Sequence, residues 1–257
     1  MEWNDYLASI RRDSALLAIA ARKGLDQPVP CCEGWKVRDV VAHTGVVHRH
    51  KDAIVREQWA DGQPDLEAAP DGDGLIAWFE AGAEQLVDLL AATDPTTPVW
   101  TWYEPDSTVG FWYRRMAHET LIHRVDAEQA HGEVSPIDPS LATDGIDEIL
   151  RVFMADIPVW GSSTARERMI RLTAGDRSWV MRDAVFSGTS PGGEVYDDYQ
   201  MFAMADAHHE ETDASVTGTP EVLDLWLWGR GSVDDLVVTG DESLVALLRA
   251  TAARDTQ

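Results

Sequence analysis

Three residues of this chain have the types and spacing of a metal site, and two of them lie in one predicted helix. Glu119 and His123 are four residues apart in a segment with the apolar period of a helix. Their side chains therefore project one turn apart, with Cβ atoms about 5–6 Å from each other. Trp112 and Met116 fall on the same face, which favours burial of the pair. Because an isolated buried carboxylate is costly, we expect a positive group beside Glu119.

The third residue interrupts the apolar stripe of another predicted helix. His43 lies between Val40 and Val47, where an apolar side chain would be expected. Metal sites in helical bundles are built by inward-facing side chains of different helices, so His43 can meet Glu119 and His123. Two imidazoles and one carboxylate match a catalytic zinc with an open position for water or substrate. The alternatives are a solvated glutamate–histidine pair and a hydrogen-bonded core histidine.

Further polar residues lie close to these three in the sequence. Asp126 follows His123 by three residues and can accept the second ring N–H of that histidine, which would orient it. His48 can line the mouth of the cavity, although a solvated histidine is the commoner case. His118 points about 100° away from Glu119, so we expect it beside the site or at the surface.

The elements that must position these residues follow from the apolar period. We expect a four-helix bundle with long connections between the second and third and between the third and fourth helices. The predicted helices span approximately residues 3–22, 35–59, 75–90 and 110–130. A linker-like stretch at 135–139 then ends an N-terminal domain at residues 1–135.

The period changes beyond that linker, which predicts a smaller α+β domain over residues 140–257. It begins with a helix at 141–155. The predicted strands are 168–174, 178–185, 194–203, 214–217 and 236–239, and the remaining helices are 220–228 and 242–252.

Composition narrows the class of protein and its partners. The chain has 257 residues and a formal net charge of −24, from 45 acidic and 21 basic residues. That charge repels nucleic acids and anionic membrane surfaces. No apolar run approaches the roughly 20 residues of a membrane span, and the N-terminus lacks the pattern of a signal peptide. We therefore expect a cytoplasmic monomer that binds small molecules and neither nucleic acid nor membrane.

The two cysteines of the chain, Cys31 and Cys32, are adjacent. Neighbouring Cα atoms lie about 3.8 Å apart, below the roughly 4.4 Å minimum of ordinary disulfides, so a bond between them would be strained. Two thiols in one place can help to bind a metal, but free cysteines are the commoner case. The sequence by itself assigns them no chemistry.

Four motifs occur in order along nearly the whole chain. They are VPCCEGWKVRDVVAH at 29–43, VGFW at 109–112 running on through AHET at 117–120 to HR at 123–124, LWLWGR at 225–230 and VTGD at 238–241. Together they resemble the mycothiol-dependent maleylpyruvate isomerase family. The chain departs from the common pattern at Lys36, where a hydroxyl residue would cap the second helix, and at the cysteine doublet.

The resemblance implies a DinB-like four-helix domain that holds a divalent metal, usually zinc. It also implies a C-terminal domain similar to the sterol carrier protein fold. By motif position, the metal ligands of the family fall on His43, Glu119 and His123. Family members with an assigned activity use the metal to bind the thiol of mycothiol.

The same resemblance suggests a residue that binds the substrate. Arg230 is the candidate for holding substrate carboxylates, and a cap on the preceding helix is its alternative role. His48 and Trp112 are the candidates for contact with the thiol. The expected protein is thus a zinc-dependent, mycothiol-using isomerase or S-transferase. The alternatives are a non-catalytic metal-containing carrier of an apolar small molecule and a regulator that senses thiol stress through its cysteines.

Overall fold

The computed structural model describes residues 1–57, 66, 68–206 and 211–256. The chain divides into two compact units, Met1–Pro136 and Ile137–Gln257. The expected end of the second helix at Trp59 lies outside the described residues. Within the described part of the chain, none of the helices combines the length and the apolar composition that a membrane crossing requires.

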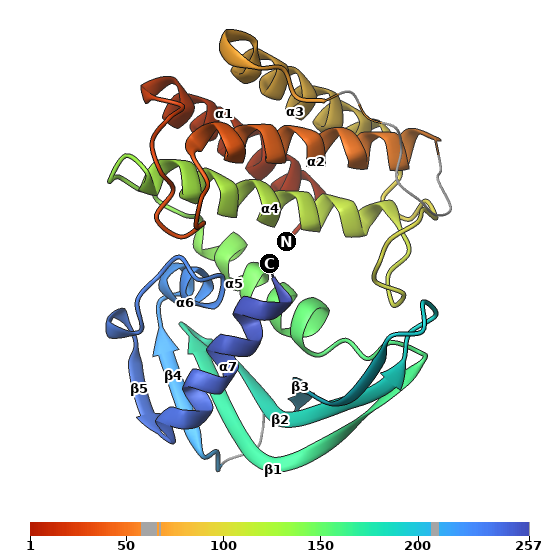
Figure 1. Ribbon diagram of the computed structural model, residues 1–257, viewed down its shortest axis with the longest axis vertical. Coiled ribbons are helices and arrows are strands. Elements are labelled where there is room, and N and C mark those ends of the chain that lie inside the picture. Colours follow the sequence, from red (N-terminus) through yellow and green to blue (C-terminus); the bar gives the residue numbers. More distant parts are fainter. Residues whose placement is uncertain (58–65, 67, 207–210, 257) are drawn as a thin grey trace. The chain divides into compact units, whose positions relative to one another are not determined.

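The first unit contains the four predicted helices. They are α1 (Trp3–Lys23), α2 (Val37–Glu57), α3 (Leu75–Ala92), which follows the short 3-10 helix η1 (Gly72–Gly74), and α4 (Val109–Gln129). Helix α1 packs against α3 and α4, and α2 packs against the same two helices (Figure 1). Buried side chains such as Ile10, Phe79 and Leu121 fill the space between them. The predicted four-helix architecture is confirmed.

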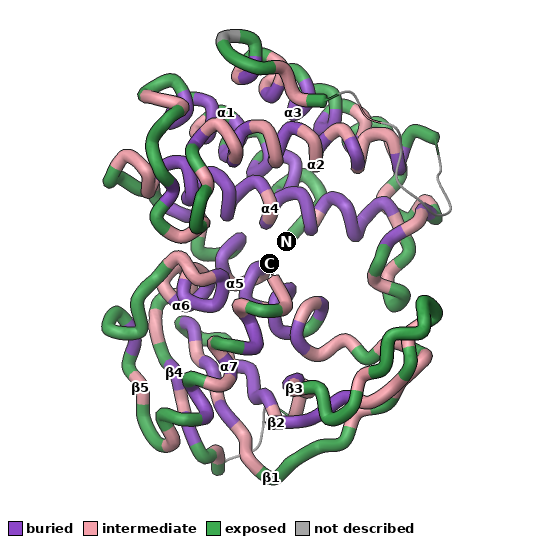
Figure 2. The backbone as a smooth tube through the Cα atoms, in the orientation of Figure 1, coloured by how far each residue is buried: buried purple, intermediate pink, exposed green. Residues whose placement is uncertain are grey.

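Helix α4 is buried around nearly its whole circumference, and in Figure 2 it is mostly purple with short pink interruptions. A helix surrounded in this way is usually apolar on all sides. This one instead buries charged side chains that pair with one another. Arg124, which is fully buried, lies 2.7 Å from Glu128 and 3.4 Å from Asp13 of α1. The polar residues of α4 are therefore interior groups with partners.

The loop between α1 and α2 is held by backbone hydrogen bonds. The Val29 N–H donates to the Trp35 carbonyl at 2.9 Å, and the Trp35 N–H donates to the Cys32 carbonyl at 3.0 Å. Gly34 completes this turn with a φ of +80°, a left-handed conformation that glycine adopts at low cost. The loop thus carries Cys31, Cys32 and Trp35 on a defined turn against the helices.

The second unit is a five-stranded sheet with helices along one face (Figure 1). The sheet order is β3-β2-β1-β4-β5, in which only the β1–β4 pair is parallel. The strands are β1 (Gly161–Ala174), β2 (Arg177–Thr189), β3 (Val195–Ala205), β4 (Ala214–Gly218) and β5 (Val237–Gly240). The helices are α5 (Pro139–Glu148), the π-helix η2 (Ile149–Met154), α6 (Pro220–Leu227), the 3-10 helix η3 (Val233–Asp235) and α7 (Glu242–Asp255).

The fold class predicted for this unit, α+β, is confirmed, with two differences in detail. Strand β1 begins at Gly161, seven residues before the expected start at 168. Residues 161–167 are mostly exposed and lack the alternating apolar pattern that identifies a strand. The expected helix at 141–155 changes from α to π geometry after Glu148.

Candidate metal centre

The structure brings His43, Glu119 and His123 together from two helices. The Nε2 atom of His43, on α2, lies 3.2 Å from Oε1 of Glu119, on α4. The Nε2 atom of His123 lies 3.2 Å from the same oxygen. One ligand atom from each residue lies within 4.8 Å of the others. The polar residues that interrupt the apolar faces of α2 and α4 thus meet at one point.

Arg115 supplies the positive group expected beside the carboxylate. This buried arginine, one turn before Glu119 on α4, donates from Nη2 to Oε2 of Glu119 at 2.7 Å. Burial opposes ionisation of Glu119, but the charges and hydrogen bonds of His123, His43 and Arg115 outweigh it and hold its pKa well below the usual range. Glu119 is therefore a carboxylate with one oxygen fixed by Arg115 and the other facing the two imidazoles.

Asp126 orients His123, as the i to i+3 spacing predicts. The Nδ1 atom of His123 lies 2.9 Å from Oδ2 of Asp126, whose side chain is fully buried. Burial lowers the pKa of His123, but the Glu119 charge and the bonds to Asp126 and Glu119 outweigh it and raise the pKa to about 9. With its Nδ1 hydrogen directed at Asp126, the ring presents Nε2 to the centre of the cluster.

Trp35 forms a wall of the cluster that the sequence reasoning missed. Its ring stacks on His123 with centroids 6.3 Å apart and lies 5.3 Å from the His43 ring. Trp35 was expected to begin the second helix, but α2 begins at Val37 and Trp35 lies in the loop before it, where the helical period does not apply. The ligand side chains themselves are unequally covered, because His43 is 40% exposed while His123 is 11% exposed. The cluster is thus open to solvent on the side of His43.

The chemistry of these residues fits a divalent cation. Two neutral nitrogen donors and one carboxylate are a common zinc set that leaves a position for an exogenous ligand. In a tetrahedral site with bonds of about 2.0–2.1 Å, donor atoms lie about 3.3 Å apart. The two 3.2 Å separations from Glu119 Oε1 are close to that value. The hydrogen bonds from Arg115 and to Asp126 hold two of the ligands in place.

His48 and Trp112 lie inside the helical unit. His48 is fully buried, with Nε2 2.9 Å from Oγ1 of Thr120 and its ring stacked on Phe79, and burial lowers its pKa to about 4. Trp112 is also fully buried and donates from Nε1 to the Trp100 carbonyl at 3.1 Å. These are packing contacts, and a role of either residue in thiol binding stays a prediction.

His118 is buried, which corrects one of its two expected positions. A place at the surface is excluded, because only 1% of it is exposed and its ring lies against that of Tyr6, whereas a place beside the site stays a prediction. The helical period places His118 away from Glu119 correctly. It does not reveal that α4 has protein on every side.

Arg230 belongs to the second unit. Its Nη1 atom donates to the carbonyl of Trp228, the C-cap residue that follows α6, at 2.5 Å. This contact matches the capping alternative. A role in binding substrate carboxylates stays a prediction.

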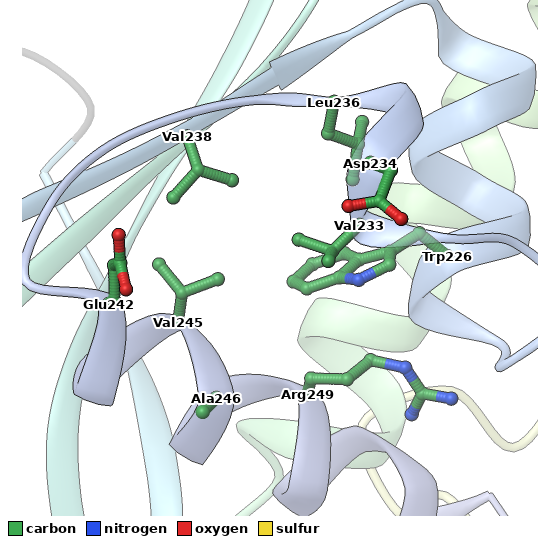
Figure 3. Close-up of a pocket in the computed structure, with 9 residues that line it drawn as sticks. All are labelled: Trp226, Val233, Asp234, Leu236, Val238, Glu242, Val245, Ala246 and Arg249. Carbon is green, nitrogen blue, oxygen red and sulfur yellow. The ribbon is translucent and has the colours of Figure 1, made fainter.

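The second unit also contains a cavity of about 650 Å³ between α6, β5 and α7 (Figure 3). Its wall is largely apolar and includes Trp226 of the LWLWGR motif. The charged groups at its edge are Asp234, Glu242 and Arg249. Burial and the charge of Arg230 lower the pKa of Arg249. The carrier alternative predicts an apolar pocket in this domain, but most of the lining could not be named from the sequence, because it comes from segments that only the fold brings together.

The comparisons with known proteins agree with this architecture. The mycothiol maleylpyruvate isomerase (MDMPI) N-terminal domain matches residues 6–128, and the MDMPI C-terminal domain matches residues 140–247. No curated protein matches the chain in sequence.

Two solved structures share the fold over nearly their full length. One is the crystal structure of the mycothiol-dependent maleylpyruvate isomerase, with a TM-score of 0.61 and 15% identity over 94% of this chain and 95% of that chain. The other is a mutant of that isomerase in which a histidine is replaced by alanine, with a TM-score of 0.61, 14% identity and the same coverage. Both domain matches and the shared fold place this chain in the mycothiol-dependent maleylpyruvate isomerase family.

Proposed function

We propose that this chain is a zinc-dependent enzyme that activates a low-molecular-weight thiol, mycothiol, for addition to an electrophilic small molecule. The reaction would be a cis–trans isomerisation of the maleylpyruvate type or a thiol S-transfer. The observation that carries the proposal is the convergence of His43, Glu119 and His123 on one point. Membership of the family supports mycothiol as the thiol.

A zinc ion at this point would favour the thiolate form of a bound thiol, whose free pKa of about 8.5 leaves it mostly protonated at neutral pH. The residues of the chain have three tasks around that chemistry. Arg115 keeps the Glu119 carboxylate charged and oriented, and Asp126 keeps Nε2 of His123 turned toward the cluster. The His43 side chain is partly exposed, so a thiol can reach the cluster from that side.

Both reactions begin by forming the same kind of bond, between the thiol sulfur and a carbon of the substrate. The sulfur attacks a carbon of a cis double bond conjugated to carbonyls, and the electron pair of that double bond moves onto the conjugated carbonyl. Rotation about the new single bond and loss of the thiol then return the sulfur and leave the trans product. If the attacked carbon carries a leaving group, that group departs with its electron pair and the thioether is the product. For either substrate, we propose that Arg230 binds a carboxylate.

Metal content and thiol-dependent turnover test the proposal together. The purified protein should contain about one equivalent of zinc bound by this cluster, and Glu119→Ala should lose that metal and the mycothiol-dependent isomerisation of maleylpyruvate or conjugation of an electrophile. His131→Ala is the matched control, because this histidine is absent from the cluster. Full retention of metal by the Glu119→Ala protein would overturn the proposal.

The carrier function remains the second candidate because of the cavity in the second unit (Figure 3). A volume of about 650 Å³ with an apolar wall is within the usual range of small-molecule sites. An apolar fluorescent probe bound there, by a protein that shows no thiol-dependent turnover with any electrophile, would favour the carrier over the enzyme.

A further inference from the structure

A second group of potential metal ligands lies next to the first. One of its members, Asp126, also contacts His123 of the first group. The Sγ atom of Cys31 lies 3.0 Å from Oδ1 of Asp126, and the Sγ atom of Cys32 lies 3.8 Å from Oδ2. All three ligand atoms lie within 4.8 Å of one another. We propose that Cys31, Cys32 and Asp126 form a second cation site, for a thiophilic divalent metal, separate from the His43–Glu119–His123 cluster.

The backbone of the loop holds both thiols toward α4. The Cys32 N–H donates to the Val29 carbonyl at 3.3 Å, and the Cys32 carbonyl accepts from the Trp35 N–H at 3.0 Å. Both cysteines are half-buried and pack against the helical core. They are thus held at one place, yet a metal ion from solvent can reach them.

Asp126 provides an anchored oxygen between the two clusters. Its side chain is fully buried, and one of its oxygens, Oδ2, is engaged by His123 at 2.9 Å. The other oxygen, Oδ1, faces the Cys31 thiol. A cation that replaces the thiol protons would sit beside a buried carboxylate, which is more stable with a positive charge next to it.

The donor types set the class of metal. Two sulfurs and one carboxylate oxygen suit zinc-like ions, because thiolates prefer soft or borderline cations over magnesium or calcium. Binding of one divalent ion would release the two thiol protons and form two metal–sulfur bonds. The competing state, a disulfide between adjacent cysteines, is strained, so the thiols stay available as ligands.

Cobalt titration of the metal-free, full-length protein tests this site. The sample is kept reduced with a phosphine, and no thiol is added. Because the chain has two cysteines in total, any sulfur-to-cobalt charge-transfer band must come from Cys31 or Cys32. The expected result is this band in the unaltered protein, at least tenfold weaker cobalt binding with Cys31→Ser or Cys32→Ser, and complete loss of the band in the double variant.

Glu119→Gln separates this proposal from the proposed function. It removes a ligand of the first cluster and leaves the three residues of the second, so the band should persist in that protein. The double serine variant should in turn keep one equivalent of bound cobalt without the band. Both serine changes are nearly isosteric, and far-ultraviolet circular dichroism checks that the helices are intact. Saturation of the unaltered, reduced protein with cobalt without a sulfur band would overturn the proposal.

Discussion

The candidate metal cluster and the cavity of the second unit place their charged groups in opposite ways. At the cluster, Arg115 and Asp126 are buried, the Glu119 side chain is 17% exposed, and each of the three is paired with a neighbour. The sheet unit lines its cavity with apolar side chains and leaves Asp234 and Glu242 at the exposed edge. Buried paired charges hold a reactive centre in fixed geometry, whereas an apolar cavity selects a ligand by shape and hydrophobicity.

Replacing a buried arginine that pairs with a carboxylate should give the largest change in the free energy of unfolding. Arg115→Ala leaves the Glu119 carboxylate without its arginine, so we expect the free energy of unfolding of the metal-free protein to fall by about 3–5 kcal/mol. Chemical denaturation measures this loss, which should shrink when metal is bound.

The matched control for that change lies in the sheet unit. Arg151 pairs with Asp147 at 2.8 Å, but half of its side chain is exposed. Arg151→Ala should therefore cost less than about 1 kcal/mol. Equal losses for the two variants would contradict the contrast between the buried Arg115 pair and the exposed Arg151 pair.

The pH dependence of metal binding should be the next largest effect. His123 has a pKa of about 9 in the metal-free protein, so a proton competes with the metal for its Nε2 atom at lower pH. Affinity should rise about tenfold per pH unit from 7 toward 9 and then level off. Calorimetry of the Cys31→Ser, Cys32→Ser protein in buffers of different ionisation enthalpy should detect about one proton released at pH 7.5, since this background has no thiol protons to release. An affinity that stays constant from pH 7 to 9 would contradict metal binding by a His123 whose pKa is raised to about 9.

Loss of the group that orients His123 should have a smaller effect on metal binding. Asp126→Asn keeps the shape of the side chain but removes its charge, and we expect metal affinity at the first cluster to fall about 10- to 100-fold. Measurement in a Cys31→Ser, Cys32→Ser background isolates that cluster. Asp52→Asn, at an exposed pair with Arg56 on α2, is the control and should leave the affinity unchanged.

Arg230 distinguishes substrate binding from helix capping. If it binds a substrate carboxylate, Arg230→Lys should raise KM about tenfold, the size of one charge-assisted hydrogen bond, with unfolding free energy and metal content nearly unchanged. A purely capping role predicts a lower free energy of unfolding with KM unaltered.

Filling the cavity should have the smallest effect on the metal centre. Ala246 lines the cavity from the exposed side of α7, so Ala246→Trp should weaken binding of an apolar fluorescent probe several-fold without changing metal content. Ala250→Trp, on the same helix but outside the lining, is the control. A change in metal content with Ala246→Trp would show that the two units do not act separately in binding.

The helices and the meeting of His43, Glu119 and His123 were predictable, because the apolar period identifies the helices and these polar residues lie at core positions of that period. His43 and Glu119 interrupt apolar stripes, and a polar residue at a core position is visible in the sequence. Arg115 was visible in the same way, four residues before Glu119, but was not used.

The rest of the site depends on contacts that no local pattern reports. Cys31 meets Asp126 across 95 residues of sequence, and Trp35 reaches the histidines from a loop. The cavity of the second unit likewise arises from packing between separate elements. The helical period describes which residues share a face, but it does not tell how many faces are covered, as the burial of His118 shows.

The most direct test of the metal-bound thiol is cobalt spectroscopy of the Cys31→Ser, Cys32→Ser protein during titration with mycothiol. This protein has no sulfur ligands of its own, so a sulfur-to-cobalt band reports binding of the added thiol alone. We expect a band that saturates with mycothiol in this protein. The band should be absent from a variant that carries Glu119→Ala in addition to the two serine changes. A cobalt-loaded protein with only the two serine changes that shows no such band at saturating mycothiol would contradict a metal-bound thiol.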